Sequence, residues 1–438
     1  MSYAPAVVLD PPLAVLSGAR TPFAKAFGPM SRIPADELGR IALEAALQRG
    51  DFSPLEIGEV IFGNVAGPAE ASNVSRVIAL RAGVPQDRPA HSVQRNCASG
   101  MESLVAAWHA LRDGRADLVA AGGVESMSNI PLLVDKRMQN WLVQFGGKRH
   151  WWEKMKMLGQ LRPDYFRPQS ALLLGLTDPT CGLNMAQTAE VLARDFGITR
   201  ATQDEFALQS HQRAVAAWEN GFMQDELVAL SAEQTGGHAL DRDSGPRPSQ
   251  NMESLAKLRP IVDRKLGVIT AGNSCPITDG GVALVLSLPE KAEQRNNPPL
   301  GYIKGYAVAG CEPKRMGLGP VFAIDKLLKQ TGLKLANFDL IEINEAFAAQ
   351  VLACTHALGS EQFAKEQLGR SEAIGVVDPQ KLNVHGGAIA LGHPVGASGT
   401  RLVLTLLRSL KQRGLKRGLA ALCVGGGQGF AMWLETEN

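Results

Sequence analysis

Apolar residues recur along the chain in two ordered series that predict the same succession of elements. In the first half, CASG at 97–100 opens a run of apolar residues spaced three and four apart, which indicates an amphipathic helix. A short apolar run at 118–121 follows and ends at two glycines. In the second half, GASG at 396–399 opens a similar helical pattern, and the apolar run 419–424 ends at three glycines. Each half therefore reads as strand, loop, helix, buried strand and glycine turn.

A second correspondence lies upstream of each series. EIGEVIFGN at 56–64 resembles FDLIEINEA at 338–346. Strands that alternate with helices predict an α/β architecture with mainly parallel strands. Chance similarity between βαβ units could produce one such match, but two ordered correspondences in each half favour an internal duplication.

The segment between the two series, about 126–270, has no counterpart in either half. Residues 136–168 carry eight Lys or Arg against two Asp or Glu, with three Trp, two Phe and one Tyr. Such a stretch can lie on an anionic membrane, bind a phosphate-rich ligand or dock a partner subunit. It can equally be a solvated loop with its aromatic residues packed beneath it. Further along, Thr202 is a candidate helix N-cap, with Glu205 at capping-box spacing.

Composition and charge exclude several classes of protein. In 438 residues, a hydrophobic content of 45% and a charged content of 20% exclude a disordered chain. The net charge of +2 gives no reason to expect a nucleic-acid partner. Six cysteines without a C-x-x-C pair argue against a disulfide framework and a thiolate zinc site. The N-terminal residues show no targeting pattern, so we expect a cytoplasmic protein.

Cys97 is the strongest candidate for chemistry. It stands at the predicted start of a helix, after the strand-like run 91–94. Unpaired N–H groups and the positive end of the helix dipole would stabilise a thiolate there and lower the pKa of the thiol. The strand–turn–helix context resembles that of nucleophiles in other α/β enzymes. Taken alone, a cysteine at such a position is more often explained by the packing of a small side chain.

Three further residues occupy related junctions of the repeat. His393 precedes the second helix, where the duplication mirrors Cys97. Cys423 ends a buried strand beside three glycines, where N–H groups can face an oxyanion. Asn344 ends another apolar strand, and ligands of parallel sheets gather at such ends. Each has a plain structural account, as a cap neighbour, a core residue and a turn former. Together they place two thiols, an imidazole and an amide at corresponding junctions.

The motifs around these residues resemble those of the thiolase family over nearly the whole chain. The blocks that carry the catalytic candidates are VQRNCASG, NEAFA, NVHGGAIALGHPVGASGTR and CVGGGQG. Further similar blocks are RTPF, GGVESMS, NMAQTAE, QDEFALQSH, LAKLRP and TAGNSCPITDGG. Segment 136–168 resembles the thiolase subunit of fatty-acid oxidation complexes. The catalytic blocks look like ordinary thiolases, because the complex-associated enzymes usually have His where this chain has Asn344.

This resemblance implies an α/β, duplicated thiolase fold with layers in the order α/β/α/β/α. The N-terminal half would comprise 1–125 and 271–296, and the C-terminal half 297–438. An inserted loop domain, 126–270, would bind CoA and the acyl chain.

The resemblance also implies the reaction. A thiolase transfers an acyl group between 3-ketoacyl-CoA, CoA and acetyl-CoA, with Cys97 as the nucleophile that carries the acyl group. His393 and a water held by Asn344 would form one oxyanion site, and the N–H groups of Cys97 and Gly425 the other. His393 would also activate Cys97. Cys423 would be the general acid and base.

Cofactors and partners follow from the same resemblance. No metal or prosthetic group is required, because coenzyme A enters as a substrate. We expect acyl-CoA and CoA as ligands, no nucleic acid, and a homodimer or homotetramer. Residues 136–168 are the candidate contact with a membrane surface or with a hydratase/dehydrogenase partner.

Several positions depart from the family pattern or match it less specifically. Cys275 stands where many thiolases have a Ser that contacts the CoA pantetheine, and Met185 matches an acyl-pocket residue after Asn184, where His is frequent. Arg247 aligns with a CoA-binding Arg, although a surface Arg in a Gly/Pro loop is as plausible. His385 replaces a common Asn and is either a polar neighbour of the site or a packing residue.

Other activities are compatible with parts of this pattern. A biosynthetic acetyl-CoA acetyltransferase specific for acetoacetyl-CoA would have the same catalytic residues. A ketoacyl synthase shares the duplicated fold but generally has His or Asn where this chain has Cys423. A non-catalytic acyl-CoA or lipid carrier would not need all four of Cys97, Asn344, His393 and Cys423.

Overall fold

The computed structural model describes residues 7–295 and 298–437. The predicted boundary at 296/297, residues 1–6 of the first predicted domain and residue 438 lie outside the described residues. The strands are β1 (Val7–Arg20), β2 (Ala24–Lys25), β3 (Glu59–Gly63), β4 (Ala90–Val93), β5 (Val119–Ser126), β6 (Leu132–Leu133), β7 (Gln169–Ser170), β8 (Thr278–Ser287), β9 (Gly301–Gly310), β10 (Leu340–Ile343), β11 (Arg417–Val424) and β12 (Gln428–Glu435). The helices are α1 (Ala35–Arg49), α2 (Val74–Arg81), α3 (Ser99–Arg112), α4 (Lys136–Gly147), α5 (Trp151–Leu158), α6 (Ala171–Gly175), α7 (Met185–Asp195), α8 (Arg200–Glu219), α9 (Ala232–Thr235), α10 (Met252–Ala256), α11 (Pro289–Gln294), α12 (Gly319–Thr331), α13 (Ala348–Gly359), α14 (Glu361–Phe363), α15 (Ala388–Leu391) and α16 (Val395–Gln412).

The two halves of the chain build the same strand arrangement. In the first half the order is β4-β3-β5-β8-β1, and in the second it is β10-β11-β12-β9. β3–β5 and β10–β11 are parallel pairs, whereas β5–β8 and β11–β12 are antiparallel. A parallel bridge from Ile341 to Leu382 stands where β4 pairs with β3 in the first half. β1 also pairs with β9, so the two sheets form one hydrogen-bonded sheet. This shared order supports the predicted duplication.

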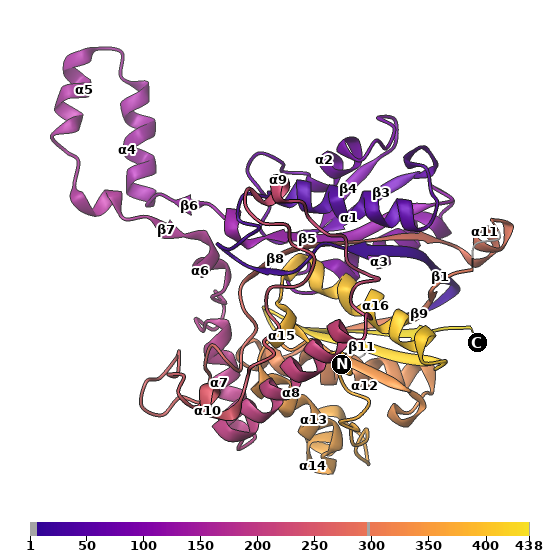
Figure 1. The fold of residues 1–438 in the computed structure, drawn as a ribbon. Helices are drawn as coiled ribbons and strands as arrows, with labels where there is room; N and C mark the ends of the chain where they lie inside the picture. The colour runs from indigo at the N-terminus through magenta and orange to yellow at the C-terminus, as the bar shows by residue number, and fades with distance from the viewer. Residues whose placement is uncertain (1–6, 296–297, 438) are drawn as a thin grey trace.

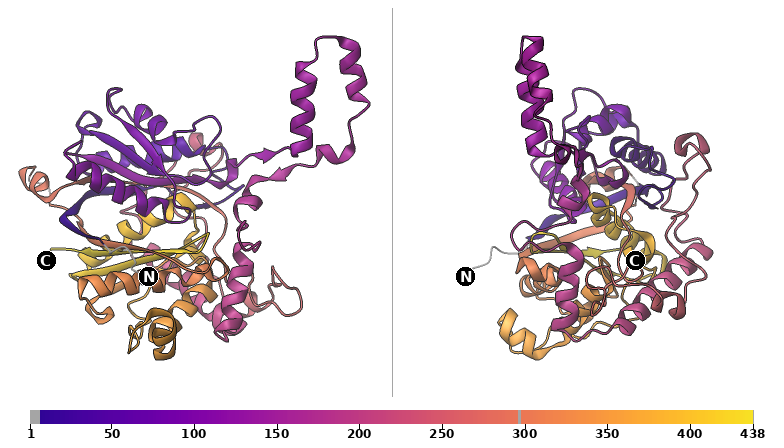
Figure 2. Two further views of the ribbon diagram at one scale, coloured as in Figure 1. Left: turned by 180° about the vertical axis from the view of Figure 1, so that it is seen from behind. Right: turned by 90° about the vertical axis from the view of Figure 1, so that its left-hand side faces the viewer.

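Helices form three layers around the two halves of the sheet (Figures 1 and 2). α3 and α16 lie between the halves and pack against each other and against both of them. α1 covers the outer face of the first half and α12 that of the second. Apolar side chains of α3 and α16 share one core with residues of β5 and β11, and burying each large one contributes about 1.5–3 kcal/mol. The expected α/β/α/β/α layering is thus present.

The prediction of mainly parallel strands is wrong. Among the strand pairs described in the large sheet, three are parallel (β3–β4, β3–β5 and β10–β11) and six are antiparallel. The glycine turn at 425–427 joins β11 to β12 as a hairpin, which reverses the chain without a crossover helix. β8 returns from the inserted segment and runs antiparallel to both of its neighbours, β1 and β5.

The glycines that end the two apolar runs, Gly122–Gly123 and Gly425–Gly427, have different positions in the sheet. Gly425 and Gly426 lie in the predicted turn, whereas Gly122 and Gly123 lie inside β5 rather than after it. A Cβ atom on Gly122 would stand 2.1 Å from the carbonyl oxygen of Val282. The first pair therefore permits close backbone approach in the sheet, and the predicted turn there is wrong.

The start of α8 also differs from the prediction. The N-cap is Thr199, whose hydroxyl accepts a hydrogen bond from the backbone N–H of Thr202. Thr202 is thus inside the helix, and the predicted capping box with Glu205 is wrong. The helix therefore begins three residues earlier than the pattern indicated, because the Thr199 hydroxyl satisfies an N–H group of its first turn.

Residues 136–158 form a helical hairpin that projects from the body of the molecule (Figures 1 and 2). The short antiparallel pair β6–β7 connects it to the rest of the chain. The possibility of a solvated loop above packed aromatic residues is therefore wrong, because the segment is helical and Trp151 and Trp152 are 70% and 50% exposed. The domain boundaries proposed for this insert, at 126 and 270, stay predictions.

Candidate active site

Cys97 sits on a sharp turn between β4 and α3. Asn96, directly before it, has a φ of 44°, a left-handed conformation that Asn adopts more readily than most residues. The Asn96 side chain donates a 2.7 Å hydrogen bond to the carbonyl oxygen of Gly425, which ties this turn to the turn after β11. The backbone N–H groups of Gly425 and of Cys97 itself both face the Cys97 sulfur and lower the pKa of its thiol. Two donors from different halves of the chain therefore converge on one thiol.

The pKa of Cys97 does not fall as the helix position predicts. Burial raises it above its ordinary value, the N–H groups of Gly425 and Cys97 pull it down, and the nearby Glu125 carboxylate raises it further. The desolvation of a buried thiolate outweighs the two backbone donors, so the prediction of a lowered pKa is wrong. At neutral pH the group is a thiol, and it needs a base before it can act as a nucleophile.

His393 presents such a base. Its Nδ1 lies 2.6 Å from the Ser398 hydroxyl, which itself donates to the carbonyl oxygen of Pro394. Nδ1–H must therefore be the donor to Ser398, which leaves Nε2 with a free lone pair. Nε2 is buried and has no hydrogen-bond partner among the described residues. Burial lowers the pKa of His393 to about 4, with a contribution from Arg401, so the imidazole is neutral at pH 7.

Cys97 and His393 stand at equivalent places on two crossing helices. Each lies three residues before a glycine, Gly100 and Gly396 respectively, and these glycines meet where α3 and α16 cross. A Cβ on Gly100 would lie 2.8 Å from the Gly396 carbonyl oxygen. The predicted convergence of the two loop–helix junctions is supported by this crossing.

Asn344 and Cys423 come from the carboxyl ends of two neighbouring parallel strands, β10 and β11. Asn344 donates its backbone N–H to Ala421, two residues before Cys423. The Asn344 side chain is fully buried, and neither its Nδ2 nor its Oδ1 has a partner among the described residues. A buried amide that the protein leaves unpaired is suited to a substrate or to a substrate-bound water.

The Cys423 thiol lies near enough to Cys97 for the charges of the two groups to interact. Burial raises the pKa of Cys423 well above its ordinary value, and the charge of Cys97 raises it further. Cys423 packs in an apolar cluster with Ala346, Phe347 and Met185. The Met185 sulfur also lies 3.6 Å from where a Cβ on Gly425 would stand. Cys423 is thus a protonated thiol at neutral pH in an apolar wall of the site.

Arg247, in the inserted segment, and Cys275, in the loop before β8, border this centre. The backbone N–H of Cys275 donates to Ala346, and burial raises the pKa of its thiol to about 12, with a contribution from Cys97. Arg247 is exposed, and its side chain has no ion pair or hydrogen bond within the described ranges. Its loop reaches the site because a Cβ on Gly245 would stand 2.1 Å from the Ala390 carbonyl oxygen, three residues before His393.

Two departures from the family pattern have structural accounts. His385 stacks on Phe222 at a ring distance of 3.7 Å, and its Nε2 is 3.0 Å from the Ser409 hydroxyl. Ser409 is eleven residues beyond Ser398 along α16, about 16 Å from the His393 end. His385 is therefore a packing residue. Asn184 caps α7, accepting a hydrogen bond from the N–H of Gln187.

Sequence reasoning missed the residues that hold these groups in place. They are Ser398, which fixes the tautomer of His393, Thr278, which accepts the N–H of His393, Asn96, and the buried Glu125. Ser398 and Asn96 stand inside the motifs that contain His393 and Cys97, so their positions in the sequence could have identified them as neighbours of the site. Thr278 and Glu125 also stand inside quoted motifs, TAGNSCPITDGG and GGVESMS, but these blocks are remote in sequence from His393 and Cys97, so the sequence alone does not show that they meet.

No group of three or more His, Cys, Asp or Glu in the described part of the chain is arranged to hold a metal ion. No helix formed by residues 7–295 or 298–437 is both long and apolar enough to cross a membrane.

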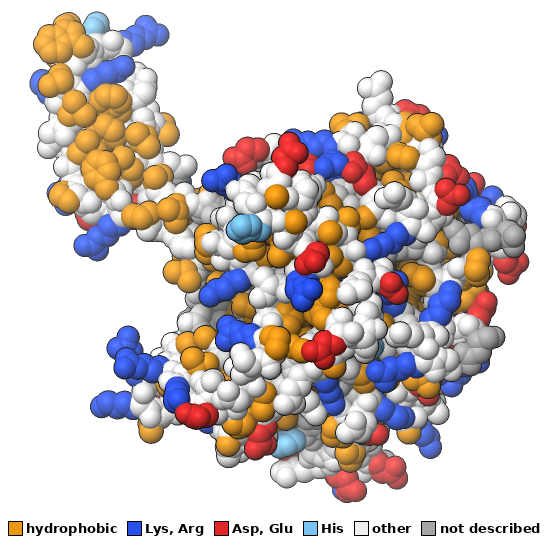
Figure 3. Space-filling model, viewed as in Figure 1, with side chains coloured by type: hydrophobic (Ala, Val, Ile, Leu, Met, Phe, Trp, Pro, Cys, Tyr) orange, Lys and Arg blue, Asp and Glu red, His pale blue; other side chains and the backbone are white. Residues whose placement is uncertain are grey.

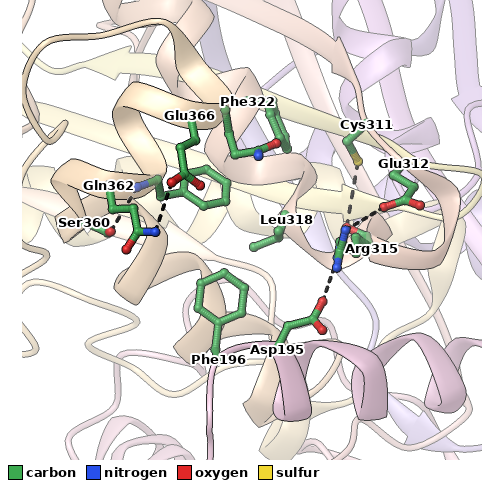
Figure 4. A pocket seen from close by; sticks show the side chains of 12 residues that line it. Asp195, Phe196, Cys311, Glu312, Arg315, Leu318, Phe322, Ser360, Gln362 and Glu366 are labelled. Atoms are coloured by element: carbon green, nitrogen blue, oxygen red, sulfur yellow. Dashed lines mark hydrogen bonds and ion pairs between the residues drawn. The ribbon is translucent and has the colours of Figure 1, made fainter.

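A cavity of about 410 Å³ opens elsewhere, between the end of α7, the start of α12 and α14 (Figure 4). Arg315 crosses it between Asp195 and Glu312, and Phe196 and Phe322 line it. None of the predicted catalytic residues lines this cavity. It is therefore separate from the centre built around Cys97.

Comparisons with known proteins agree with these features. Residues 13–290 match the family model of the thiolase N-terminal domain, and residues 297–436 match that of the thiolase C-terminal domain. The chain is 39% identical to a 3-ketoacyl-CoA thiolase of Aliivibrio fischeri over 426 residues, which cover 97% of this chain and 96% of the relative. It is 38% identical to a 3-ketoacyl-CoA thiolase of Yersinia enterocolitica, with 97% of each chain covered.

Solved structures extend this similarity to the fold. Human mitochondrial 3-ketoacyl-CoA thiolase in complex with CoA superposes with a TM-score of 0.84 at 35% identity, and the match covers both chains fully. The acetyl-CoA acetyltransferase of Bacillus anthracis gives 0.83 at 35% identity, over 99% of this chain and all of that one. The predicted fold is confirmed.

Proposed function

Because the chain belongs to the thiolase family, we propose that it is an acyltransferase that cleaves 3-ketoacyl-CoA with CoA, reversibly, through an acyl-enzyme on Cys97. One observation carries this proposal. The Cys97 thiol has two N–H donors at its sulfur and a second thiol, Cys423, close by. At the neighbouring helix start, His393 holds a free Nε2 lone pair.

The first half-reaction forms the acyl-enzyme. Nε2 of His393 takes the proton of Cys97, and the thiolate attacks the keto carbon of the substrate. The N–H groups of Cys97 and Gly425 stabilise the resulting oxyanion. When that carbonyl re-forms, the bond between the alpha and keto carbons breaks, and its electron pair leaves as the enolate of acetyl-CoA. The protonated His393 and a water held by Asn344 stabilise the enolate oxygen, and the Cys423 thiol delivers its proton to the carbon.

The second half-reaction releases the product. The Cys423 thiolate left by the first step takes the proton of an incoming CoA thiol. The CoA sulfur attacks the thioester on Cys97, and the Cys97 thiolate leaves and recovers its proton from His393. Each group returns to its starting protonation state, so the cycle requires no metal and no prosthetic group. The same steps run backwards perform a Claisen condensation.

The remaining contacts suit an acyl-CoA. Met185, beside Gly425, would face the acyl chain, and Cys275 would line the pantetheine channel where a Ser is usual. The unpaired guanidinium of Arg247 would stack on the adenine or pair with a phosphate. All six cysteines are free, which suits the reducing cytoplasm, and we place the enzyme there as a homodimer or homotetramer.

A series of 3-ketoacyl-CoA substrates from four to sixteen carbons, assayed with CoA, tests the activity. Acetyl-CoA should form together with an acyl-CoA two carbons shorter than the substrate. Turnover of substrates longer than four carbons is expected, because the relatives are named for 3-ketoacyl-CoA in general and not for one four-carbon substrate. A strict preference for the four-carbon substrate, with condensation the faster direction, would instead favour the acetoacetyl-CoA-specific enzyme. Absence of acetyl-CoA with every substrate would contradict the proposal.

The helical hairpin, residues 136–158, gives the protein a second surface. Apolar side chains exposed on its two helices include Val143 at 71% and Met155 at 57%, besides Trp151 and Trp152 (Figure 3). Lys148 and Arg149 lie at its tip, between α4 and α5, and His150 separates them from the tryptophans. Trp141, in contrast, is used by the hairpin itself, because its indole N–H donates to Met157. We propose that the tip docks on an anionic membrane surface.

Replacing Trp151 and Trp152 together by alanine should abolish most binding to anionic vesicles. The wild-type protein should co-sediment with phosphatidylserine vesicles, more weakly at high salt, and the double variant should bind about tenfold less. A matched control is Leu266→Ala with Val376→Ala, which removes two side chains that are each 84% exposed outside the hairpin. Equal sedimentation of all three proteins would exclude the membrane. Loss of co-purification with a hydratase/dehydrogenase subunit, with vesicle binding unchanged, would assign the tip to that partner.

A further inference from the structure

The two helices that begin at the site cross where Gly100 meets Gly396, and further glycines let each helix contact a strand backbone to backbone. A Cβ on Gly123, in β5, would stand 1.9 Å from the carbonyl oxygen of Gly396, in α16. A Cβ on Gly63, at the end of β3, would stand 2.3 Å from the backbone of Ser99, in α3. Small shifts at this crossing therefore move Cys97 and His393 relative to each other.

A buried carboxylate, Glu125, ties this crossing together. The side chain is fully buried at the end of β5. One of its oxygens accepts hydrogen bonds from the Ala66 N–H at 3.0 Å and the Asn64 side chain at 3.1 Å. The other accepts the Val65 N–H at 3.1 Å and the Gly396 N–H at 3.0 Å. Four donors are what an ionised carboxylate accepts, and a neutral amide could not satisfy them all.

The bond to Gly396 satisfies a backbone N–H in the first turn of α16. The N-cap of that helix is Pro394, which offers no side-chain acceptor. Glu125 therefore caps α16 from the other half of the chain. Since His393 lies three residues before Gly396, this cap holds the imidazole against the half that carries Cys97.

The charge of Glu125 also reaches the nucleophile. It is one of the causes that raise the pKa of Cys97. Burial raises the pKa of Glu125 itself to about 7, opposed by its backbone donors, and Asp279 of β8 adds to the rise. The titratable groups that face Glu125 are thus Cys97 before α3 and Asp279 in β8, while the loop 64–66 and α16 present hydrogen-bond donors.

We propose that Glu125 is a positioning residue for the reaction: it fixes the start of α16, and with it His393, against Cys97, and it supplies a carboxylate whose charge reaches the nucleophile. This inference rests on the proposed function for the roles of Cys97 and His393. It adds a carboxylate that touches neither substrate nor the reacting atoms.

Glu125→Gln tests both parts of the inference. The substitution keeps the volume but leaves two of the four donors facing an NH₂ group. We expect kcat for thiolysis to fall about tenfold to a hundredfold, with KM for CoA within about twofold. Removing the charge should also shift the midpoint of Cys97 alkylation by iodoacetamide to lower pH, as followed by intact-mass analysis. A loss of packing alone would not move that midpoint in this direction.

Glu125→Asp distinguishes the effect of the hydrogen bonds from the effect of the charge. It also provides a second test if Glu125→Gln fails to fold. It keeps the charge but is too short to reach Gly396 and Ala66 together, so kcat should fall while the alkylation midpoint stays. Glu59→Gln is the control for removing a buried carboxylate in the same sheet, and its midpoint should match the wild type, because Glu59 lies at the start of β3 and pairs with Arg115. An unchanged kcat in both Glu125 variants, or an unchanged midpoint in Glu125→Gln, overturns the inference. If the wild type lacks thiolysis altogether, the proposed function fails, and the alkylation profile still reports on Glu125.

Discussion

Cys97→Ala should lower the rate of thiolysis by about 10⁵-fold, the order seen when a covalent nucleophile is removed. Thiolysis cannot proceed without this thiol, because the acyl group must be held on the enzyme as a thioester while acetyl-CoA leaves and CoA arrives. Incubation with acyl-CoA should add one acyl group to the wild-type protein, seen by intact-mass analysis. The alanine variant should show none.

A matched control is Cys354→Ser, which replaces a buried thiol that donates to the carbonyl oxygen of Gly317. This variant should keep both the adduct and most of the activity. An acyl adduct that persists in Cys97→Ala, on Cys275 or Cys423, would move the nucleophile to another thiol and overturn the mechanism.

Cys423→Ser should lower kcat for thiolysis by about 10³-fold while leaving the acyl-enzyme able to form. The hydroxyl fills nearly the same space in the apolar cluster around Ala346 and Phe347, but its pKa is too high for it to exchange a proton with carbon or with CoA. Acylation of Cys97 by acyl-CoA depends on His393 instead, so the mass adduct should remain.

The decisive measurement is proton exchange at the methyl carbon of acetyl-CoA in deuterated water. The wild type should exchange these protons through Cys423, and the serine variant should not. Exchange at the wild-type rate in Cys423→Ser would show that a different group handles the proton, and His393 would be the next candidate.

The site residues were predictable because they stand at element junctions that local pattern marks. Cys97, His393 and Cys423 each lie where an apolar run meets a glycine-rich turn or a helix start, and the duplication relates the first two. The structure supports this convergence through the crossing of α3 and α16 and the charge interaction between Cys97 and Cys423. It also separates His385 from them, although His385 stands in the same motif as His393, because its ring packs on Phe222.

Expectations failed where the outcome depended on neighbours distant in the chain. The pKa of Cys97 rises because surrounding residues remove water from the thiol, an effect that the helix start alone does not reveal. Gly122 and Gly123 look like turn residues, yet the carbonyl oxygens of Val282 and Gly396 approach them within a strand.

By itself, the amino-acid order determined the two series of strands and helices, the chemical groups at their junctions and the family to which the chain belongs, since these depend on local periodicity and short motifs. The tertiary structure alone decided the direction of the strands, the protonation states of the buried groups and the part of Glu125, which joins Asn64 to Gly396 across more than three hundred positions of the chain. Those properties arise from desolvation and from hydrogen bonds between remote segments, and no local pattern specifies which segments will meet.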